Sequence, residues 1–252
     1  VRIDKKKKLS ATTFLQALGV PRHELLARFY DFEVIEVKDG KYYRKVNEGL
    51  IDLRLEAGAL PKELEVSFTV GQRITKPVLE KIRKAGVKTL QVRKAALVNK
   101  VLSSDVVDQR TGEILIAQSA ALTEELLDET LLGVSEFSVI RTAGYAFQPT
   151  LALTLAQDTC MTYEEALRDM YIKLKPGDIP SLRIMEEYIQ NLFYNARFYD
   201  LTIVGRIRTN RKLGVKVGHE TTHLTLEDIV ATIRYLIGLR ERGEGELDDI
   251  DH

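Results

Sequence analysis

The chain has 252 residues, of which 44% are hydrophobic and 29% are charged, a balance typical of a globular protein with one large or two smaller domains. No run approaches the roughly 20 apolar residues of a membrane span, so no membrane partner is predicted. The 37 basic and 37 acidic side chains cancel, and the single cysteine, Cys160, excludes an internal disulfide and a multi-thiolate metal site. A cytoplasmic location is the simplest expectation.

The first 45 residues predict two helices and then a β-hairpin. Ser10 or Thr12 can cap a first helix that stops at Gly19, and a second helix follows directly. Apolar and polar residues then alternate on both sides of Asp39-Gly40, a dipeptide typical of hairpin turns.

Residues 71–92 and 116–140 resemble each other, each with a turn, a helix start, a glycine and a short strand. The intervening stretch predicts a hairpin that turns at Thr111-Gly112. We expect a compact α+β module over residues 32–148, although two similar units could also arise by chance. The matched positions are Ile74 with Leu122, Gly86 with Gly133, and Val92 with Val139.

Beyond residue 162 helices dominate, so the fold class predicted for the whole chain is α+β. Thr162 and Ser181 can cap two helices, and Thr225 a third that ends near Gly243. Residues 201–217 are basic, and we expect them to be partly extended.

Residues 219–223, His-Glu-Thr-Thr-His, fit the H-E-x-x-H signature of zinc metalloproteases. That site requires both histidines on one helix, so that they share a face. Here Gly214 and Gly218 precede the motif, and the capped helix begins only after Thr225. We therefore interpret the motif as a polar loop, and expect no metal site.

Two further features each allow two interpretations. Cys160 could be a nucleophile, but no partner base is recognisable, and an inert thiol is commoner. The basic run from Lys5 to Lys8 could contact phosphates, or could be a solvated surface or a targeting patch.

The chain also begins without methionine and ends at Asp251-His252, from which we expect a piece of a longer polypeptide.

Three long blocks resemble the β subunit of bacterial DNA-directed RNA polymerase. They read VRIDKKKKLSATTFLQALG, MYIKLKPGDIPSLRIMEEYIQNLFYNARFYDLTIVGRIRTNRKLG and LTLEDIVATIRYLIGLRERGEGELDDIDH. The middle of the chain resembles, more weakly, an insert of some β subunits, through GQRIT and VVDQRTGEIL. The resemblance implies that residues 1–31 and 149–252 form the lobe, or second domain, of helices plus small sheets, interrupted by the 32–148 insert.

In that family the lobe forms one wall of the DNA cleft and faces downstream duplex and the non-template strand. The implied partners are therefore DNA, the other polymerase subunits and a sigma factor, in the bacterial nucleoid. The family's catalytic magnesium lies elsewhere, so the resemblance implies no catalytic residue and no cofactor in this chain. We expect the isolated chain to be inactive in RNA synthesis.

The resemblance also implies which residues contact DNA. Ile250 and Asp251 match a pocket for an unpaired guanine, whose N1–H and N2–H a carboxylate could accept together. Where the family commonly has a basic residue before Tyr-Asp-Leu, this chain has Phe198. The full implied set is Arg2, Lys5, Lys6, Lys7, Lys8, Lys175, Arg206, Ile250 and Asp251.

A second hypothesis is a free-standing nucleic-acid-binding or adaptor protein that shares the lobe fold. A third, a metallopeptidase, is disfavoured by the glycines before the histidines.

Overall fold

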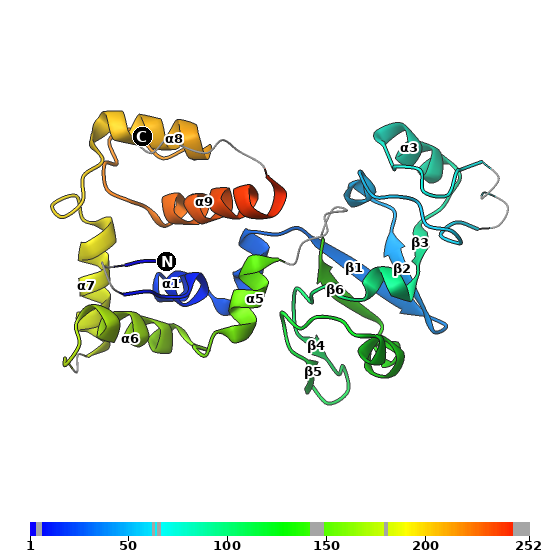
Figure 1. Ribbon diagram of the computed structural model, residues 1–252, viewed down its shortest axis with the longest axis horizontal. Helices are drawn as coiled ribbons and strands as arrows, with labels where there is room; N and C mark the ends of the chain where they lie inside the picture. Colours follow the sequence, from blue (N-terminus) through cyan, green and yellow to red (C-terminus); the bar gives the residue numbers. More distant parts are fainter. Residues whose placement is uncertain (4–6, 62–63, 65–66, 142–148, 179–180, 244–252) are drawn as a thin grey trace. The chain divides into compact units, whose positions relative to one another are not determined.

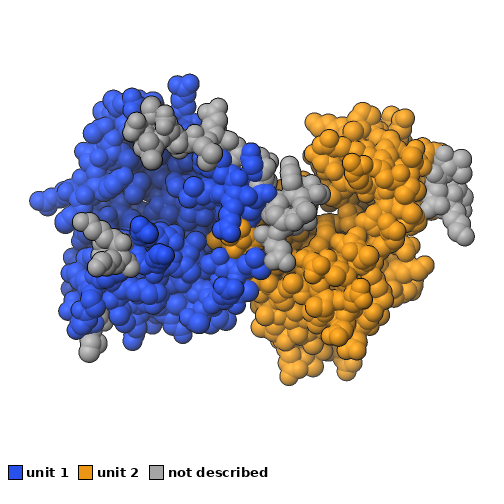
Figure 2. All heavy atoms as spheres, in the orientation of Figure 1, with its two compact units in different colours: residues 1–29, 153–252 blue, residues 30–152 orange. Residues whose placement is uncertain are grey.

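The computed structural model describes residues 1–3, 7–61, 64, 67–141, 149–178 and 181–243. The chain folds as two compact units, which Figure 2 colours separately: unit 1 is Val1–Phe29 with Leu153–His252, and unit 2 is Tyr30–Ala152. The limits of the inserted module expected from the sequence were 32 and 148. Helices and antiparallel sheets are both present, which confirms the predicted α+β class.

Unit 2 is built on a four-stranded antiparallel sheet in the order β3-β2-β1-β6 (Figure 1). Its central hairpin joins β1 (Phe32–Lys38) to β2 (Lys41–Lys45). The turn residues Asp39 and Gly40 have φ angles of 50° and 69°. Two successive positive φ values are what a two-residue type I′ hairpin requires, so the predicted hairpin is confirmed. The outer strands are β3 (Thr89–Val92) and β6 (Glu136–Ile140).

Two hydrophobic clusters hold unit 2 together. One gathers Tyr42 and Phe137, whose rings meet edge to face at 5.9 Å, with the aliphatic side chains around them. The other places Leu79 and Ile82 of one helix against Leu90 of β3. The shorter elements of the unit are α3 (Lys76–Lys84), α4 (Lys94–Leu97), β4 (Val106–Val107) and β5 (Ile114–Ile116).

The internal repeat extends to the backbone hydrogen bonds. The Ile74 amide donates to the Leu53 carbonyl at 2.8 Å, and the matching Leu122 amide donates to the Lys100 carbonyl at 2.8 Å. Each repeat ends in a strand, the first in β3 and the second in β6. These strands pair with β2 and β1 on opposite edges of the sheet. Because the same hydrogen bonds recur at matched positions, chance similarity is a poor explanation.

The helix of the second repeat is irregular, although the sequence predicted an ordinary helix there. It forms a π turn over Leu126–Thr130 and a 3-10 turn over Leu131–Gly133. The Tyr42 hydroxyl donates to the Leu127 carbonyl, which an α-helix would offer to the Leu131 amide. That amide bonds instead to the Leu126 carbonyl, five residues back.

Unit 1 is helical, and its only β structure among the described residues is the isolated bridge between Arg2 and Lys8. Helix α1 packs on α6, α6 on α7, and α8 on α9 (Figure 1). A helix was expected after Gly19, but the structure has two 3-10 turns, Arg22–Glu24 and Leu26–Arg28. The α-helices are α1 (Ala11–Ala17), α5 (Thr150–Gln157, which begins in unit 2), α6 (Tyr163–Leu174), α7 (Leu182–Tyr194), α8 (Thr202–Leu213) and α9 (Leu226–Ile237).

The predicted caps are largely confirmed. The Ser10 side chain accepts the Thr13 amide, and Thr162 and Thr225 each form a reciprocal capping box. Ser181 precedes α7 without a capping bond from its side chain.

The expectation of a partly extended segment over 201–217 is wrong for most of its length. Residues Thr202–Leu213 form α8, which ends at Gly214 with a φ of 69°. A left-handed glycine is a common helix terminator. Val215 and Val217 alternate with polar residues, as in an extended strand, but both lie after that glycine.

Candidate nucleic-acid interface

The N-terminal basic segment folds back on itself. Arg2 and Lys8 face each other in an antiparallel bridge, and the Ile3 amide donates to the Lys7 carbonyl at 3.1 Å. The side chains of Arg2 and Lys8 are exposed. Lys5 and Lys6, also predicted to contact DNA, lie outside the described residues.

The structure brings this segment beside a second predicted contact, Lys175. The Lys7 ammonium lies 3.4 Å from the carbonyl of Leu174, the last residue of α6. Lys175 follows directly, and its ammonium lies 4.6 Å from the ring centroid of Tyr188. A helix C-terminus and an aromatic face both favour a cation. Four described cations therefore share one region of unit 1: Arg2, Lys7, Lys8 and Lys175.

Arg206 is not part of that surface, and its prediction as a DNA contact is wrong for this structure. Its side chain is 0% exposed. Its guanidinium donates to Asp228 Oδ1 at 2.7 Å, to the Thr221 carbonyl at 2.7 Å and to the His223 carbonyl at 2.5 Å. With these acceptors surrounding it, the group has no access to a phosphate. Its role here is to join α8 to α9 and to the loop between them.

Asp228 is the buried counter-ion of Arg206, and it is 1% exposed. Burial tends to raise the pKa of its carboxyl, but hydrogen bonds from Arg206 and Thr225 outweigh burial and hold the pKa below its usual value. The same carboxylate accepts the Thr225 amide and hydroxyl, both at 2.8 Å. One charged group thus caps α9 and neutralises the arginine.

The His-Glu-Thr-Thr-His motif lies in a loop, as expected from the sequence, and Arg206 donates hydrogen bonds to two carbonyls of that loop. Residues 219–223 contain no helix, and α9 begins only at Leu226. The Thr222 carbonyl accepts the Leu201 amide at 2.7 Å, so three successive carbonyls, from Thr221 to His223, are hydrogen-bonded. In the part of the chain that the structure describes, no group of three or more His, Cys, Asp or Glu side chains could hold a metal ion.

Asp158 is a polar centre of unit 1 that the sequence analysis missed. Its carboxylate accepts the hydroxyls of Ser10, Thr12 and Thr13 and the amide of Cys160. Three hydroxyl residues spaced within one helical turn are the signal that could have revealed a carboxylate partner. These bonds tie the start of α1 to the end of α5. Burial, together with Asp158 and Asp169, raises the pKa of the Cys160 thiol, which disfavours a nucleophilic thiolate.

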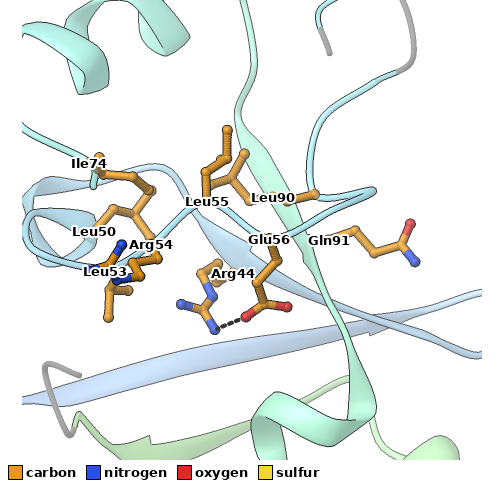
Figure 3. Close-up of a pocket in the computed structure, with 10 residues that line it drawn as sticks. Arg44, Leu50, Leu53, Arg54, Leu55, Glu56, Ile74, Leu90 and Gln91 are labelled. Atoms are coloured by element: carbon orange, nitrogen blue, oxygen red, sulfur yellow. Dashed lines mark ion pairs between the residues drawn. The ribbon is translucent and has the colours of Figure 1, made fainter. Parts of the chain in front are cut away.

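A small cavity in unit 2 carries no ligand site. Arg44 and Glu56 both line the cavity and form an ion pair there, with Arg44 Nη2 4.0 Å from Glu56 Oε1 (Figure 3). Arg44 Nε also lies 3.0 Å from Glu33 Oε1. The cavity measures about 10 Å³, room for roughly one water molecule.

Helix α8 reverses the usual pattern of an amphipathic helix, because the side chain that it buries is an arginine, Arg206. Five large apolar side chains on α8 and the turn before it are instead exposed. Phe198 is 70% exposed and Val204 61%, values far above those of a covered helix face. The five are Phe198, Tyr199, Ile203, Val204 and Ile207, and we call them the α8 apolar face.

The remaining predicted site residues, Ile250 and Asp251, lie outside the described residues, so the structure leaves their role as a prediction. Among the helices that are described, none is long and apolar enough to cross a membrane.

The chain is similar to known proteins along its whole length. A family model described as RNA polymerase Rpb2, domain 2, matches residues 141–252. The chain is 37% identical over 254 residues to a protein of Syntrophotalea carbinolica, 36% over 255 residues to one of Desulfotalea psychrophila, and 34% over 257 residues to one of Solibacter usitatus. All three are named DNA-directed RNA polymerase subunit beta. Each alignment covers 100% of this chain and 18% or 19% of the relative, so the chain spans less than a fifth of the relatives' length.

Proposed function

The chain belongs to the RNA polymerase β-subunit family, of which it matches one segment, and we propose that it works as the lobe of a bacterial polymerase β subunit during transcription. The observation that carries this proposal is similarity over the whole chain, including the 30–152 unit, at 34–37% identity. The match to Rpb2 domain 2 independently supports a lobe over residues 141–252.

In this proposal the lobe forms one wall of the cleft and holds downstream duplex and non-template DNA. The support is the cluster of Arg2, Lys7, Lys8 and Lys175 in unit 1. Four cations that each neutralise one phosphate would give a salt slope of about −3.6 on duplex DNA. Such contacts hold the backbone without reading sequence.

The chemistry of RNA synthesis is proposed to lie elsewhere in the polymerase. We expect the isolated chain to add no nucleotides, with or without magnesium, because the family's catalytic metal is expected on another subunit. Its contribution is to position DNA.

The α8 apolar face supports further protein partners within the polymerase. Exposed apolar clusters of this kind mark protein contacts. The face is flanked by exposed Arg197, Arg208 and Arg211. We propose that an apolar, acid-rimmed surface of the polymerase outside these 252 residues covers it, and that the sigma factor is a further partner of the assembled enzyme.

Fluorescence anisotropy with a labelled duplex tests the DNA contact. Replacing Arg2, Lys8 and Lys175 by glutamine together should make the salt slope shallower by up to about 2.7. Lys41→Gln is the control, because Lys41 is exposed at the hairpin of unit 2. An unchanged slope in the triple variant would contradict the proposed DNA site.

The guanine pocket requires the whole polymerase, because the family's other pocket residues are not in this chain. Asp251→Ala should relax a preference for an unpaired guanine while general DNA affinity remains. An equal loss of affinity for all four bases would exclude base readout by Asp251.

The alternative, a free-standing nucleic-acid-binding or adaptor protein, predicts a different molecular form in the cell. An antibody against this chain should detect it within a polypeptide several times longer that co-purifies with polymerase. Detection only as a free chain of about this length would favour the alternative.

A further inference from the structure

The two repeats of unit 2 carry opposite charge. The first repeat, residues 71–92, contains six basic side chains and one acid, Glu80, and the second, residues 116–140, contains five acids and no base. The contrast continues in the residues between them, so that residues 71–100 contain nine basic side chains and one acid, and residues 101–140 contain eight acids and one base, Arg110. The repeats share a backbone plan, so the difference lies in their surfaces. The nine basic residues are Arg73, Lys76, Lys81, Arg83, Lys84, Lys88, Arg93, Lys94 and Lys100.

Four of these cations are already neutralised by ion pairs. Arg73 pairs with Asp52 at 2.9 Å, and Lys100 pairs with Glu33 at 3.1 Å. Arg93 and Lys94 also have carboxylate partners. The other five have no ion pair with any described residue and are all exposed. We call them the α3 basic face: Lys76, Lys81, Arg83, Lys84 and Lys88.

The local fold explains why these cations point to solvent together. Helix α3 buries Leu79 and Ile82, three residues apart, against Leu90 of the sheet. Lys81 and Lys84 therefore occupy the opposite side of the helix, while Lys76 and Arg83 lie along its flanks and are also exposed. Nine residues at a rise of 1.5 Å give a helix about 13 Å long. Duplex DNA carries a phosphate charge about every 1.7 Å along its axis, so several phosphates fit along a helix of this length.

The chemistry of the face distinguishes a nucleic acid from a protein partner. No large apolar side chain is exposed in the described part of the chain between Val70 and Val107. Protein interfaces have an apolar or aromatic centre and are depleted in lysine. A surface of isolated cations without such a centre matches a ligand recognised by charge alone, as a phosphate backbone is.

We propose that the α3 basic face is a second nucleic-acid contact, which binds the phosphate backbone of duplex DNA without sequence preference. This contact is separate from the proposed lobe contact at Arg2, Lys7, Lys8 and Lys175. The acidic repeat gives it direction, because like charge repels DNA from the other half of the module.

The test compares three variants of the 252-residue chain on a duplex of about 20 base pairs by anisotropy between about 50 and 200 mM KCl, the range over which phosphate contacts weaken steeply. Lys81→Gln/Arg83→Gln/Lys84→Gln removes three cations from α3, at positions where glutamine retains helix propensity. Glu124→Gln/Glu125→Gln changes the acidic repeat as the matched control. Arg2→Gln/Lys8→Gln/Lys175→Gln reports on the lobe contact.

We expect the α3 variant to make the salt slope shallower by up to about 2.7, which is about 0.9 for each phosphate that is no longer neutralised. At low salt its affinity should fall at least tenfold, with unchanged circular dichroism and melting. The acidic-repeat variant should bind as well as the parent or better. If both sites are independent, the effects of the α3 and lobe variants on binding free energy should add.

An α3 variant with parental affinity and slope overturns this inference, whatever the lobe variant does. If only the lobe variant weakens DNA binding, the proposed function stands and this inference fails. If only the α3 variant weakens DNA binding, this inference stands and the proposed lobe contact fails. Sedimentation supplies a further refutation. If the α3 variant loses self-association, through the acidic repeat of another copy, but keeps its DNA binding, the face is a protein contact.

Discussion

Replacing Arg206 should weaken unit 1 more than any surface change on α8. Arg206→Met preserves much of the side-chain volume but leaves the Asp228 carboxylate buried without its cation. It also leaves two further acceptors, the carbonyls of Thr221 and His223, without their donor. Removing one partner of a buried ion pair costs about 3–5 kcal/mol.

The size of this effect sets the assay. For an m-value of about 2 kcal/mol/M, the loss moves the urea midpoint down by about 1.5–2.5 M. Circular dichroism at 222 nm follows the helices, and hydrogen exchange assigns the loss to α8 and α9. Arg206→Lys keeps a charge but cannot reach three acceptors, so its midpoint should fall between those of the parent and Arg206→Met.

Arg208→Met is the matched control, because Arg208 is an exposed arginine on the same helix. Surface changes of this kind usually stay within about 0.5 kcal/mol. Equal losses for the Arg206 and Arg208 variants would refute the buried-pair reasoning.

The deficit of Arg206→Met should also depend on pH. In the parent the pKa of Asp228 is lowered, so its contribution is complete above the unfolded value of about 3.9 and is lost as pH falls through the folded pKa. Without Arg206, burial raises that pKa, and the protonated carboxyl no longer needs a cation. The deficit should therefore be largest near pH 7 and shrink toward pH 4. A deficit that is constant over this range would show that lost packing, rather than charge, is responsible.

Four smaller predictions concern the rest of unit 1. Asp158→Ala should lower stability by about 2–3 kcal/mol in urea titrations, because the hydroxyls of Ser10, Thr12 and Thr13 lose a charged acceptor, whereas Glu164→Ala on the surface should have little effect. Thr162→Ala removes the cap of α6 and should cost about 1 kcal/mol; a loss no larger than that of Thr159→Ala, a nearby threonine that caps no helix, would contradict the capping role. Because the pKa of Cys160 is raised, its alkylation by iodoacetamide should need higher pH in the folded chain than in urea, and coincident pH profiles would count against this environment. Elemental analysis of the purified chain should find substoichiometric zinc, and tight one-to-one zinc that is lost on His219→Ala would overturn the loop interpretation.

The sequence predicted the elements whose signals are local. Asp39-Gly40 specified the β1–β2 turn, and Thr162 and Thr225 specified helix starts, because each acts on its own neighbours. The repeat was visible because matched apolar positions, such as Ile74 in the first repeat and Leu122 in the second, are both buried.

The sequence did not reveal what depends on distant partners. Helix α8 was mistaken for an extended segment since its apolar side chains face outward and its arginine inward, the reverse of the usual pattern. The π turn at Leu126–Thr130 depends on a hydroxyl from Tyr42, some 85 residues away. Arg206 was misassigned because the family resemblance implied a DNA contact at the matching arginine, and only the fold shows that Asp228 already neutralises it.

The loop from Thr221 to His223 is held through three main-chain carbonyls, and every amino acid supplies a carbonyl. These three hydrogen bonds therefore do not depend on which side chains stand at positions 221–223, although the Thr222 side chain also bonds to Asp200. A pattern such as His-Glu-Thr-Thr-His can arise in such a place by neutral drift. Searches for short catalytic motifs are most easily misled where the backbone makes most of the contacts, because those contacts do not depend on the identity of the residues.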